Sequence, residues 1–262
     1  MFTRARARGV PALIPYLMAG DPDAPTTAAL LERLPSAGAD AVELGVPYGD
    51  PLADGPTIQA AGQRALGAGM NIEGVFALAE RNTAARGVPT ILFTYYNPVL
   101  QYGIERFAVR AKHAGVSGAI IPDVPYEEIE AQLSILSAHE IDIPLLVSPT
   151  TPPVRAAAIA KRASGFVYIV SRLGVTGAGA APDTSAVVRQ IASLREVTDL
   201  PLVAGFGIST AAHVSAIAAH VDGIIVGSAL IDAYAGQRGA AAADSVELFL
   251  KSLFRASAPA SI

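Results

Sequence analysis

The sequence predicts an α/β fold in which eight parallel strands form a barrel inside a ring of helices. Short apolar runs rich in β-forming residues alternate with stretches of helical pattern, which is typical of a parallel sheet covered by helices. The runs number eight, and the 262 residues match the usual length of about 250 residues for such a barrel. No repeat, linker or low-complexity segment divides the chain. We therefore expect a single domain over residues 1–262, with residues 256–262 as a frayed tail.

The expected strands are spaced as βα units. Most begin about 22 to 35 residues after the strand before, the length of one strand, one helix and their loops. In chain order they are Ala12–Ala19, Ala41–Pro47, Thr90–Tyr96, Gly118–Asp123, Pro144–Pro149, Phe166–Arg172, Pro201–Gly207 and Gly223–Leu230. The longer gap after the second strand begins with the loop YGDPLADGP at 48–56, on the side where barrels of the TIM type carry their chemistry. This gap predicts an insertion.

Composition narrows the possible partners and chemistry. Apolar residues make up 52% of the chain, but no run approaches the roughly 18 apolar residues that a membrane-spanning helix needs. Because the chain has no cysteine, disulfides, thiolate nucleophiles and cysteine-bound metals are excluded, and we expect a cytoplasmic protein. A net charge of -4 without a basic run argues against nucleic acid. The expected partner is a small molecule or another protein.

Glu43 is the strongest candidate for a catalytic group. Val42, Leu44 and Val46 share one face of the second strand, which we expect beneath the helices, so the period of two directs Glu43 into the barrel. A carboxylate there is costly unless it is paired, and its pKa should be raised. A structural ion pair is the alternative, but all lysines lie in helical stretches and Arg172 is the only arginine at a strand end. We therefore interpret Glu43 as a catalytic acid or base.

Other residues near the strand ends remain ambiguous. Asp50 and Asp54 follow the second strand in Asp-Pro and Asp-Gly-Pro contexts, which suit turns and helix starts, so capping explains them better than catalysis. Tyr95 and Tyr168, near the ends of strands three and six, could contact a ligand but are equally explained as core aromatics. Neither pair identifies a reaction by itself.

Glycine-rich turns follow the last three strands and predict a phosphate site. They are GVTGAG at 174–179, GFGIS at 205–209 and GS at 227–228. The loops after strands seven and eight of a barrel commonly hold phosphate, because backbone N–H groups and a helix dipole point at the anion and glycine allows close approach. Ordinary turn chemistry is the alternative for any one of them, but three at consecutive strand ends favour a phosphate ligand. The first turn is also a candidate mobile lid.

Missing residues exclude two ways in which barrels break carbon–carbon bonds. A Schiff-base aldolase needs a lysine on a barrel strand, whereas Lys112, Lys161 and Lys251 lie in helical stretches. A metal-dependent aldolase needs clustered ligands, and the four histidines, His213 among them, are expected away from the rim. Acid and base catalysis on a substrate that acts as its own electron sink remains.

Residues 43–59, ELGVPYGDPLADGPTIQ, closely resemble the signature of tryptophan synthase α chains. Further matches are GDP at 20–22, YNP at 96–98, PD at 122–123, SRLGVTG at 171–177 and GFGIS at 205–209, so the resemblance spans nearly the whole chain. It implies a TIM barrel that cleaves indole-3-glycerol phosphate to indole and glyceraldehyde 3-phosphate by a retro-aldol route. This reaction is a carbon–carbon lyase step of tryptophan biosynthesis.

The resemblance also implies roles for individual residues. Glu43 would protonate carbon 3 of the indole, and Asp54 would accept the indole N–H as positive charge develops, which favours Asp54 over Asp50. Thr176 would hydrogen-bond Asp54 when the lid closes. The indole and glycerol parts would be bordered by Tyr16, Phe93, Tyr95 and Tyr168, and the phosphate would be held by backbone N–H groups of Gly177, Gly207, Gly227 and Ser228.

A partner chain is implied as well. Tryptophan synthase α chains work with a β chain that binds pyridoxal phosphate and condenses the indole with serine, so the resemblance implies an αββα heterotetramer and no cofactor or metal in this chain. We expect the loops after strands two and six, with Pro47 nearby, to meet that β chain. Tyr16, Tyr48, Gly49 and Leu173 depart from the commonest family pattern, and none is the proposed acid or base.

Three alternatives remain open. A stand-alone indole-3-glycerol-phosphate lyase of the same fold would release indole without a partner. A phosphosugar isomerase shares the phosphate site but usually needs a cysteine–aspartate or two-aspartate base, which the absence of cysteine and the place of Glu43 argue against. A non-catalytic module would bind a phosphorylated ligand and only activate its partner. An indole-release assay with and without the β chain separates these alternatives.

Overall fold

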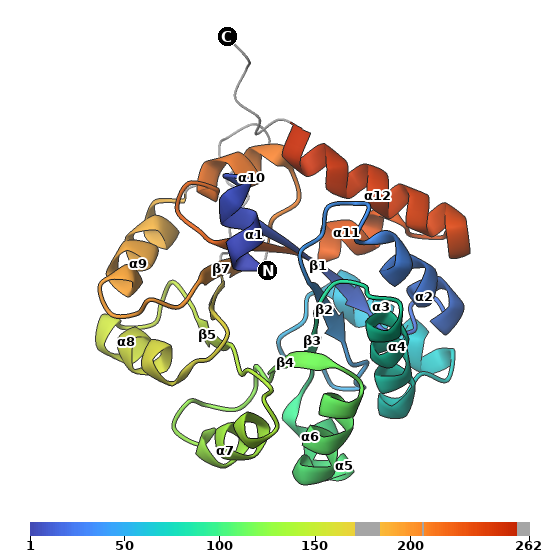
Figure 1. The fold of residues 1–262 in the computed structure, drawn as a ribbon, viewed down its shortest axis with the longest axis horizontal. Coiled ribbons are helices and arrows are strands. Elements are labelled where there is room, and N and C mark those ends of the chain that lie inside the picture. Colours follow the sequence, from blue (N-terminus) through green and yellow to red (C-terminus); the bar gives the residue numbers. More distant parts are fainter. Residues whose placement is uncertain (171–183, 206, 256–262) are drawn as a thin grey trace.

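The computed structural model describes residues 1–170, 184–205 and 207–255, and Figure 1 shows a ring of strands surrounded by helices. The strands are β1 (Ala12–Met18), β2 (Val42–Gly45), β3 (Thr90–Phe93), β4 (Val116–Ile120), β5 (Leu145–Val147), β6 (Val167–Val170), β7 (Leu202–Gly205) and β8 (Gly223–Val226). The helices are α1 (Phe2–Ala7), α2 (Ala24–Arg33), α3 (Pro56–Gly67), α4 (Ile72–Ala84), α5 (Tyr96–Tyr102), α6 (Ile104–His113), α7 (Glu130–Ala138), α8 (Pro153–Arg162), α9 (Ser185–Arg195), α10 (Ala211–Ile217), α11 (Ser228–Ala233) and α12 (Gly239–Arg255). Within these ranges, no helix has the length and apolar composition needed to cross a membrane.

The strands form one parallel barrel. Their order in the sheet is β4-β3-β2-β1-β8-β7-β6-β5, so strands that are consecutive in the chain are neighbours in space. The ring closes between β4 and β5 through a parallel bridge from Gly118 to Asp142, and the N–H of Ala119 donates to the Asp142 carbonyl oxygen at 2.8 Å. The predicted fold class is therefore confirmed.

The strand bounds differ from the expected ones in two informative places. β4 begins at Val116, two residues before the expected Gly118, and it ends at Ile120. The expected eighth strand ends at Val226, because the next helix begins at Ser228. The expected insertion after β2 contains an additional helix, since both α3 and α4 lie between β2 and β3.

Helix α1 covers the amino-terminal end of the barrel. Phe2 packs edge-on against Phe166 with ring centroids 6.1 Å apart, just before β6 begins. Arg6 forms an ion pair with Asp222, whose carboxylate also accepts the N–H of Leu202 at 2.9 Å at the start of β7. With this end covered, the carboxyl ends of the strands and their loops are left to form the site.

Strand β2 separates its side chains as the period of two requires. Val42 and Leu44 are fully buried on the face that packs beneath the helices, whereas Glu43 points into a cavity inside the barrel. Glu43 is in register with Tyr16 of β1 and Ile91 of β3. The apolar face therefore holds the strand in the orientation that directs the carboxyl group inward.

Truncation of Leu44 tests this packing. Leu44→Ala should lower the free energy of unfolding by about 2–5 kcal/mol, because a packed core cannot fill the lost volume. Leu248→Ala is the control: Leu248 lies on α12 and is 68% exposed, so its truncation should change stability by less than about 0.5 kcal/mol. Urea unfolding followed by circular dichroism measures both. Equal midpoints and slopes for the two variants would contradict the packing.

Candidate active site

One cavity at the carboxyl ends of the strands brings most of the predicted site residues together. Its volume is about 650 Å³, within the range of about 300–1,000 Å³ that small-molecule sites occupy. The predicted residues that line it are Tyr16, Glu43, Asp54, Phe93, Tyr168, Gly207, Gly227 and Ser228. Thr176 and Gly177 lie outside the described residues, and Tyr95 is not among the described residues that line the cavity.

Glu43 is buried in this cavity with an unpaired carboxyl oxygen. Only 2% of the residue is exposed, and its Oε2 has no hydrogen-bond partner within the described part of the chain. Loss of hydration raises the pKa of Glu43 to about 8, and the nearby negative charge of Asp54 adds to the increase. At neutral pH the group is therefore mostly protonated and able to donate a proton.

Asp54 faces the same cavity, but its pKa is lower than that of Glu43. Burial raises the pKa of Asp54 to about 6, while a hydrogen bond from the Tyr95 hydroxyl lowers it. Asp54 is not the cap that its sequence context favours, because Gly55 is the N-cap of α3 and makes no side-chain capping bond. The carboxylate of Asp54 is thus available to the cavity, and at neutral pH it is mostly ionised.

Tyr95 fixes the loop that carries Asp54. Its hydroxyl accepts the backbone N–H of Ala53 at 3.0 Å and donates to Asp54, so one side chain holds two consecutive residues. From the other side, Nε2 of Gln59 donates to the carbonyl oxygen of Asp54 at 2.8 Å. Asp50 is exposed and does not line the cavity. The loop therefore presents Asp54 to the cavity and leaves Asp50 at the surface.

Two strand glycines make room for the tyrosines of the cavity wall. A Cβ atom at Gly45 of β2 would lie 2.2 Å from the hydroxyl oxygen of Tyr16, and one at Gly205 of β7 would lie 2.4 Å from that of Tyr168. Tyr16 also packs edge-on against Phe93, with ring centroids 6.1 Å apart. These rings give the cavity an aromatic wall beside Glu43, which suits an aromatic ligand.

The other end of the cavity is formed by backbone. Gly207 has a φ of +87°, a left-handed conformation that favours glycine. Gly227 is the N-cap of α11, which begins at Ser228, and among the described residues no side chain makes a capping hydrogen bond there. Uncapped N–H groups at a helix start attract an anion. The arrangement therefore suits a phosphate group beside Gly207 and the start of α11.

His213 corrects one expectation from the sequence. All four histidines were expected away from the rim, but His213, in the first turn of α10, lines the cavity. The N–H of Ser209 donates to Nδ1 of His213 at 3.3 Å, so the loop after β7 holds the imidazole ring. The helical pattern around His213 carries no signal for this position, because it depends on where α10 packs relative to the end of β7.

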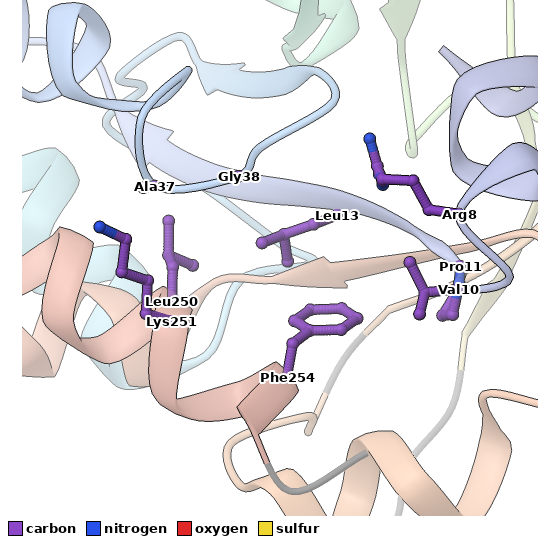
Figure 2. A pocket seen from close by; sticks show the side chains of 9 residues that line it. All are labelled: Arg8, Val10, Pro11, Leu13, Ala37, Gly38, Leu250, Lys251 and Phe254. Atoms are coloured by element: carbon purple, nitrogen blue, oxygen red, sulfur yellow. The ribbon is translucent and has the colours of Figure 1, made fainter. Parts of the chain in front are cut away.

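A second hollow lies at the opposite end of the barrel (Figure 2). It has a volume of about 340 Å³ and is lined by Leu13, Leu250 and Phe254, with Arg8 and Lys251 at its sides. Arg8 pairs with Asp40 at 2.6 Å and Lys251 pairs with Glu247. The charged side chains at this hollow are thus already paired. The hollow also lies at the amino-terminal end of the barrel, and this end contributes to stability and not to catalysis.

The cavity that contains Glu43 and Asp54 can support acid and base catalysis. Two carboxyl groups whose pKa values are separated by their surroundings can hold opposite protonation states at one pH. The three lysines lie on α6, α8 and α12 and do not line the cavity, so no amine is in place for a Schiff base. Within the described ranges, no group of three His, Asp or Glu side chains is arranged to bind a metal ion.

Comparison with known proteins identifies the family. The family model for the tryptophan synthase alpha chain matches residues 2–256. The tryptophan synthase alpha chain of Picosynechococcus sp. is 46% identical over 253 residues, covering 96% of each chain. That of Arabidopsis thaliana is 45% identical over 231 residues, covering 88% of this chain and 84% of the plant protein.

Solved structures agree with the sequence comparison. A chain of Mycobacterium tuberculosis tryptophan synthase superposes with a TM-score of 0.87 at 36% identity, covering 96% of this chain and 94% of that one. The tryptophan synthase A-subunit of Pyrococcus furiosus gives a TM-score of 0.86 at 32% identity, with 93% and 98% covered. The chain therefore belongs to the tryptophan synthase α chain family.

Proposed function

We propose that this chain cleaves indole-3-glycerol phosphate to indole and glyceraldehyde 3-phosphate, with Glu43 as the proton donor and acceptor and Asp54 as the acceptor of the indole N–H. The family cleaves this substrate in a carbon–carbon lyase reaction. The observation that carries the assignment is the buried carboxyl group of Glu43. One of its oxygens has no partner among the described residues, and it shares its cavity with a carboxyl group of lower pKa. The catalytic pair then needs neither a metal nor a lysine.

In the first step Glu43 donates its proton to carbon 3 of the indole ring. The ring becomes a cation with its positive charge centred on the nitrogen, and the Asp54 carboxylate accepts the hydrogen bond from that N–H. Because the charge on nitrogen exists only after protonation has begun, this contact is stronger in the transition state than in the ground state. Asp54 therefore accelerates the reaction and does more than bind the substrate.

In the second step the carbon–carbon bond breaks. Its electrons move into the cationic ring and restore indole, while the adjacent glycerol hydroxyl loses a proton and becomes the aldehyde carbonyl. Glu43, now a carboxylate, is the base for that proton, since its high pKa makes the ionised form a good acceptor. Glu43 ends the cycle protonated, so protons and electrons balance.

The rest of the cavity places the substrate for these steps. Tyr16, Phe93 and Tyr168 border the indole, and the N–H groups near Gly207, Gly227 and Ser228 bind the phosphate. Tyr95 acts through Asp54 by holding its loop. Thr176 and Gly177 belong to the proposal through the family resemblance alone.

A β chain completes the assembly in this proposal. The loop after β2 exposes Leu52, 79% accessible and next to the residues that hold Asp54, and an apolar side chain there suits a protein contact. Pyridoxal phosphate would be bound by that β chain, which would consume the indole. The whole assembly would be an αββα heterotetramer.

Indole release by the purified chain tests the function. Wild-type protein should release indole from indole-3-glycerol phosphate, and an added β chain should increase the rate. Glu43→Gln should lower kcat at least about 10³-fold, because the amide cannot donate the proton, and should leave ligand affinity nearly unchanged. Wild-type protein that binds the substrate but releases no indole, with or without the β chain, would favour a non-catalytic module. A high rate that the β chain does not change would favour the stand-alone lyase.

The pH dependence of kcat/KM tests the protonation states. Activity requires ionised Asp54 and protonated Glu43, so the rate should rise through a pKa of about 6 and fall through a pKa of about 8. Steady-state kinetics between pH 5 and 9.5 give both limbs. Binding of glycerol 3-phosphate over the same range controls for titration of the substrate phosphate. A rate that keeps rising above pH 8 would show that Glu43 acts ionised.

Stability against pH gives an independent test of Glu43. The pKa of Glu43 is raised from 4.5 to about 8 in the folded chain, so folding is penalised as pH rises from 4.5 to 8 and the penalty is constant above 8. Glu43→Gln removes this penalty. The variant should match wild type at pH 4 and exceed it by on the order of a few kcal/mol at pH 9, measured by urea unfolding. An equal difference at both pH values would mean that Glu43 is not buried as an acid.

A further inference from the structure

Asp21 is a buried carboxylate outside the catalytic pair, and it joins two helices. It lies in the loop after β1 and is 1% exposed. Nε of Arg64 donates to its Oδ1 at 2.7 Å and Nη2 of Arg64 to its Oδ2 at 3.0 Å, while the hydroxyl of Tyr234 donates to Oδ2 at 3.0 Å. A buried carboxylate needs such partners, and a two-point arginine contact also fixes their geometry. Arg64 belongs to α3, and Tyr234 is the C-cap of α11.

These two helices carry the two ends of the active site. Helix α3 begins two residues after Asp54, and its Ile58 lines the cavity. Helix α11 begins at Ser228, at the end of the cavity suited to phosphate. The helices pack against each other, and they lie side by side in Figure 1. The relative position of α3 and α11 therefore sets the distance between Asp54 and the phosphate site.

The loop that carries Asp21 is itself fixed. The N–H of Asp21 donates to the carbonyl oxygen of Met18 in β1 at 3.1 Å, and the N–H of Gly20 donates to Oγ1 of Thr27 at 2.9 Å. Gly20 has a φ of +86°, and a Cβ atom there would lie 2.6 Å from the side chain of Met70. Asp21 is thus anchored to the barrel, and both helices are tied to the barrel through it.

We propose that Asp21, Arg64 and Tyr234 form a positioning cluster that sets the spacing between Asp54 and the phosphate site. The cluster acts through the two helices and touches no substrate. This inference rests on the proposed function, because it assumes a ligand with an indole ring at one end of the cavity and a phosphate at the other.

Loss of one link has a selective consequence. A ligand that reaches both ends must match their spacing, so a freer α3 or α11 weakens its binding and slows its reaction. A ligand that occupies the phosphate end alone does not depend on that spacing. A cluster that only stabilised the fold would lower the stability of the chain and leave the ratio of the two affinities unchanged.

The test compares a bridging probe with a one-ended probe. Indole-3-propanol phosphate carries the ring and the phosphate but lacks the hydroxyl that cleavage requires, and glycerol 3-phosphate carries the phosphate end alone. In Arg64→Gln, affinity for the bridging probe should fall about tenfold and kcat/KM about 10- to 100-fold, with glycerol 3-phosphate binding unchanged within about twofold. Isothermal titration calorimetry on the full chain measures both affinities. Arg64→Lys, which keeps one charge-assisted bond, should recover part of the loss.

Two further variants make the result decisive. Tyr234→Phe removes only the link to α11 and should lower the affinity for the bridging probe about threefold. This variant replaces Arg64→Gln in the test if Arg64→Gln does not fold. The matched control is Arg33→Gln, because Arg33 also joins two helices: its Nη1 donates to Asp244 at 2.5 Å and Glu247 at 2.7 Å, linking α2 to α12 away from the cavity. This control should leave both affinities unchanged.

The outcomes separate the cluster from the function. If Arg64→Gln lowers the affinities for both probes equally, or lowers neither, the positioning role is overturned. The same selective loss in Arg33→Gln also overturns it, since any looser helix would then suffice. If wild-type chain binds both probes but releases no indole, the proposed function fails, while the ratio of affinities still decides the cluster. Failure of wild type to bind the bridging probe overturns both.

Discussion

The carboxyl group of Glu43 lies inside the barrel, where none of the described residues is a hydrogen-bond partner of its Oε2 and desolvation raises its pKa to about 8. Burial of an unpaired acid opposes folding above pH 4.5, so the remaining packing has to outweigh it. The apolar face of β2 contributes directly, because Val42 and Leu44 are fully buried on the side opposite Glu43. The same alternation that stabilises the strand therefore keeps the acid protonated and ready to react.

The surroundings of the acid follow from this constraint. A protonated carboxyl group in an apolar cavity transfers its proton only to a substrate held against it, and the wall formed by Tyr16, Phe93 and Tyr168 can hold a flat ring. Tyr16 and Tyr168 fit because Gly45 and Gly205 leave space for their hydroxyl ends. Asp54 is less deeply buried than Glu43 and has the Tyr95 hydroxyl as a partner, so it ionises at lower pH and the two carboxyl groups take different roles.

Both ends of the cavity depend on contacts outside it. Tyr95 and Gln59 hold the backbone on either side of the Asp54 carboxylate, and Asp21 ties α3 and α11 to the barrel. Rate enhancement by positioning requires reacting groups to be held within a fraction of an ångström, which loops alone rarely achieve. Asp54 lies just before one helix and the proposed phosphate site lies at the start of another, and these positions give the site this rigidity.

Much of the fold and the acid could be predicted from the sequence. The eight runs, their spacing and the alternation in β2 are local patterns, and local patterns predicted the barrel and the inward direction of Glu43. The glycine-rich turns predicted a phosphate site, and the family resemblance pointed to Asp54. The structure places Asp54 and the described parts of the last two turns around one cavity. Strand ends were less predictable, since β8 ends at Val226 and Gly227 is the N-cap of a helix that begins at the expected strand residue Ser228.

The sequence by itself determined which strand residues alternate between the two faces and where the glycine-rich turns fall. It also excluded the catalytic mechanisms for which the chain has no suitably placed lysine or metal ligands. Only the tertiary structure decided that Asp54 is free of a capping role, that His213 lines the cavity, and that Asp21 links two helices 43 and 213 residues away along the chain. The physical reason is that capping, burial and long-range pairing depend on distances between segments. Those distances exist only after the barrel has closed.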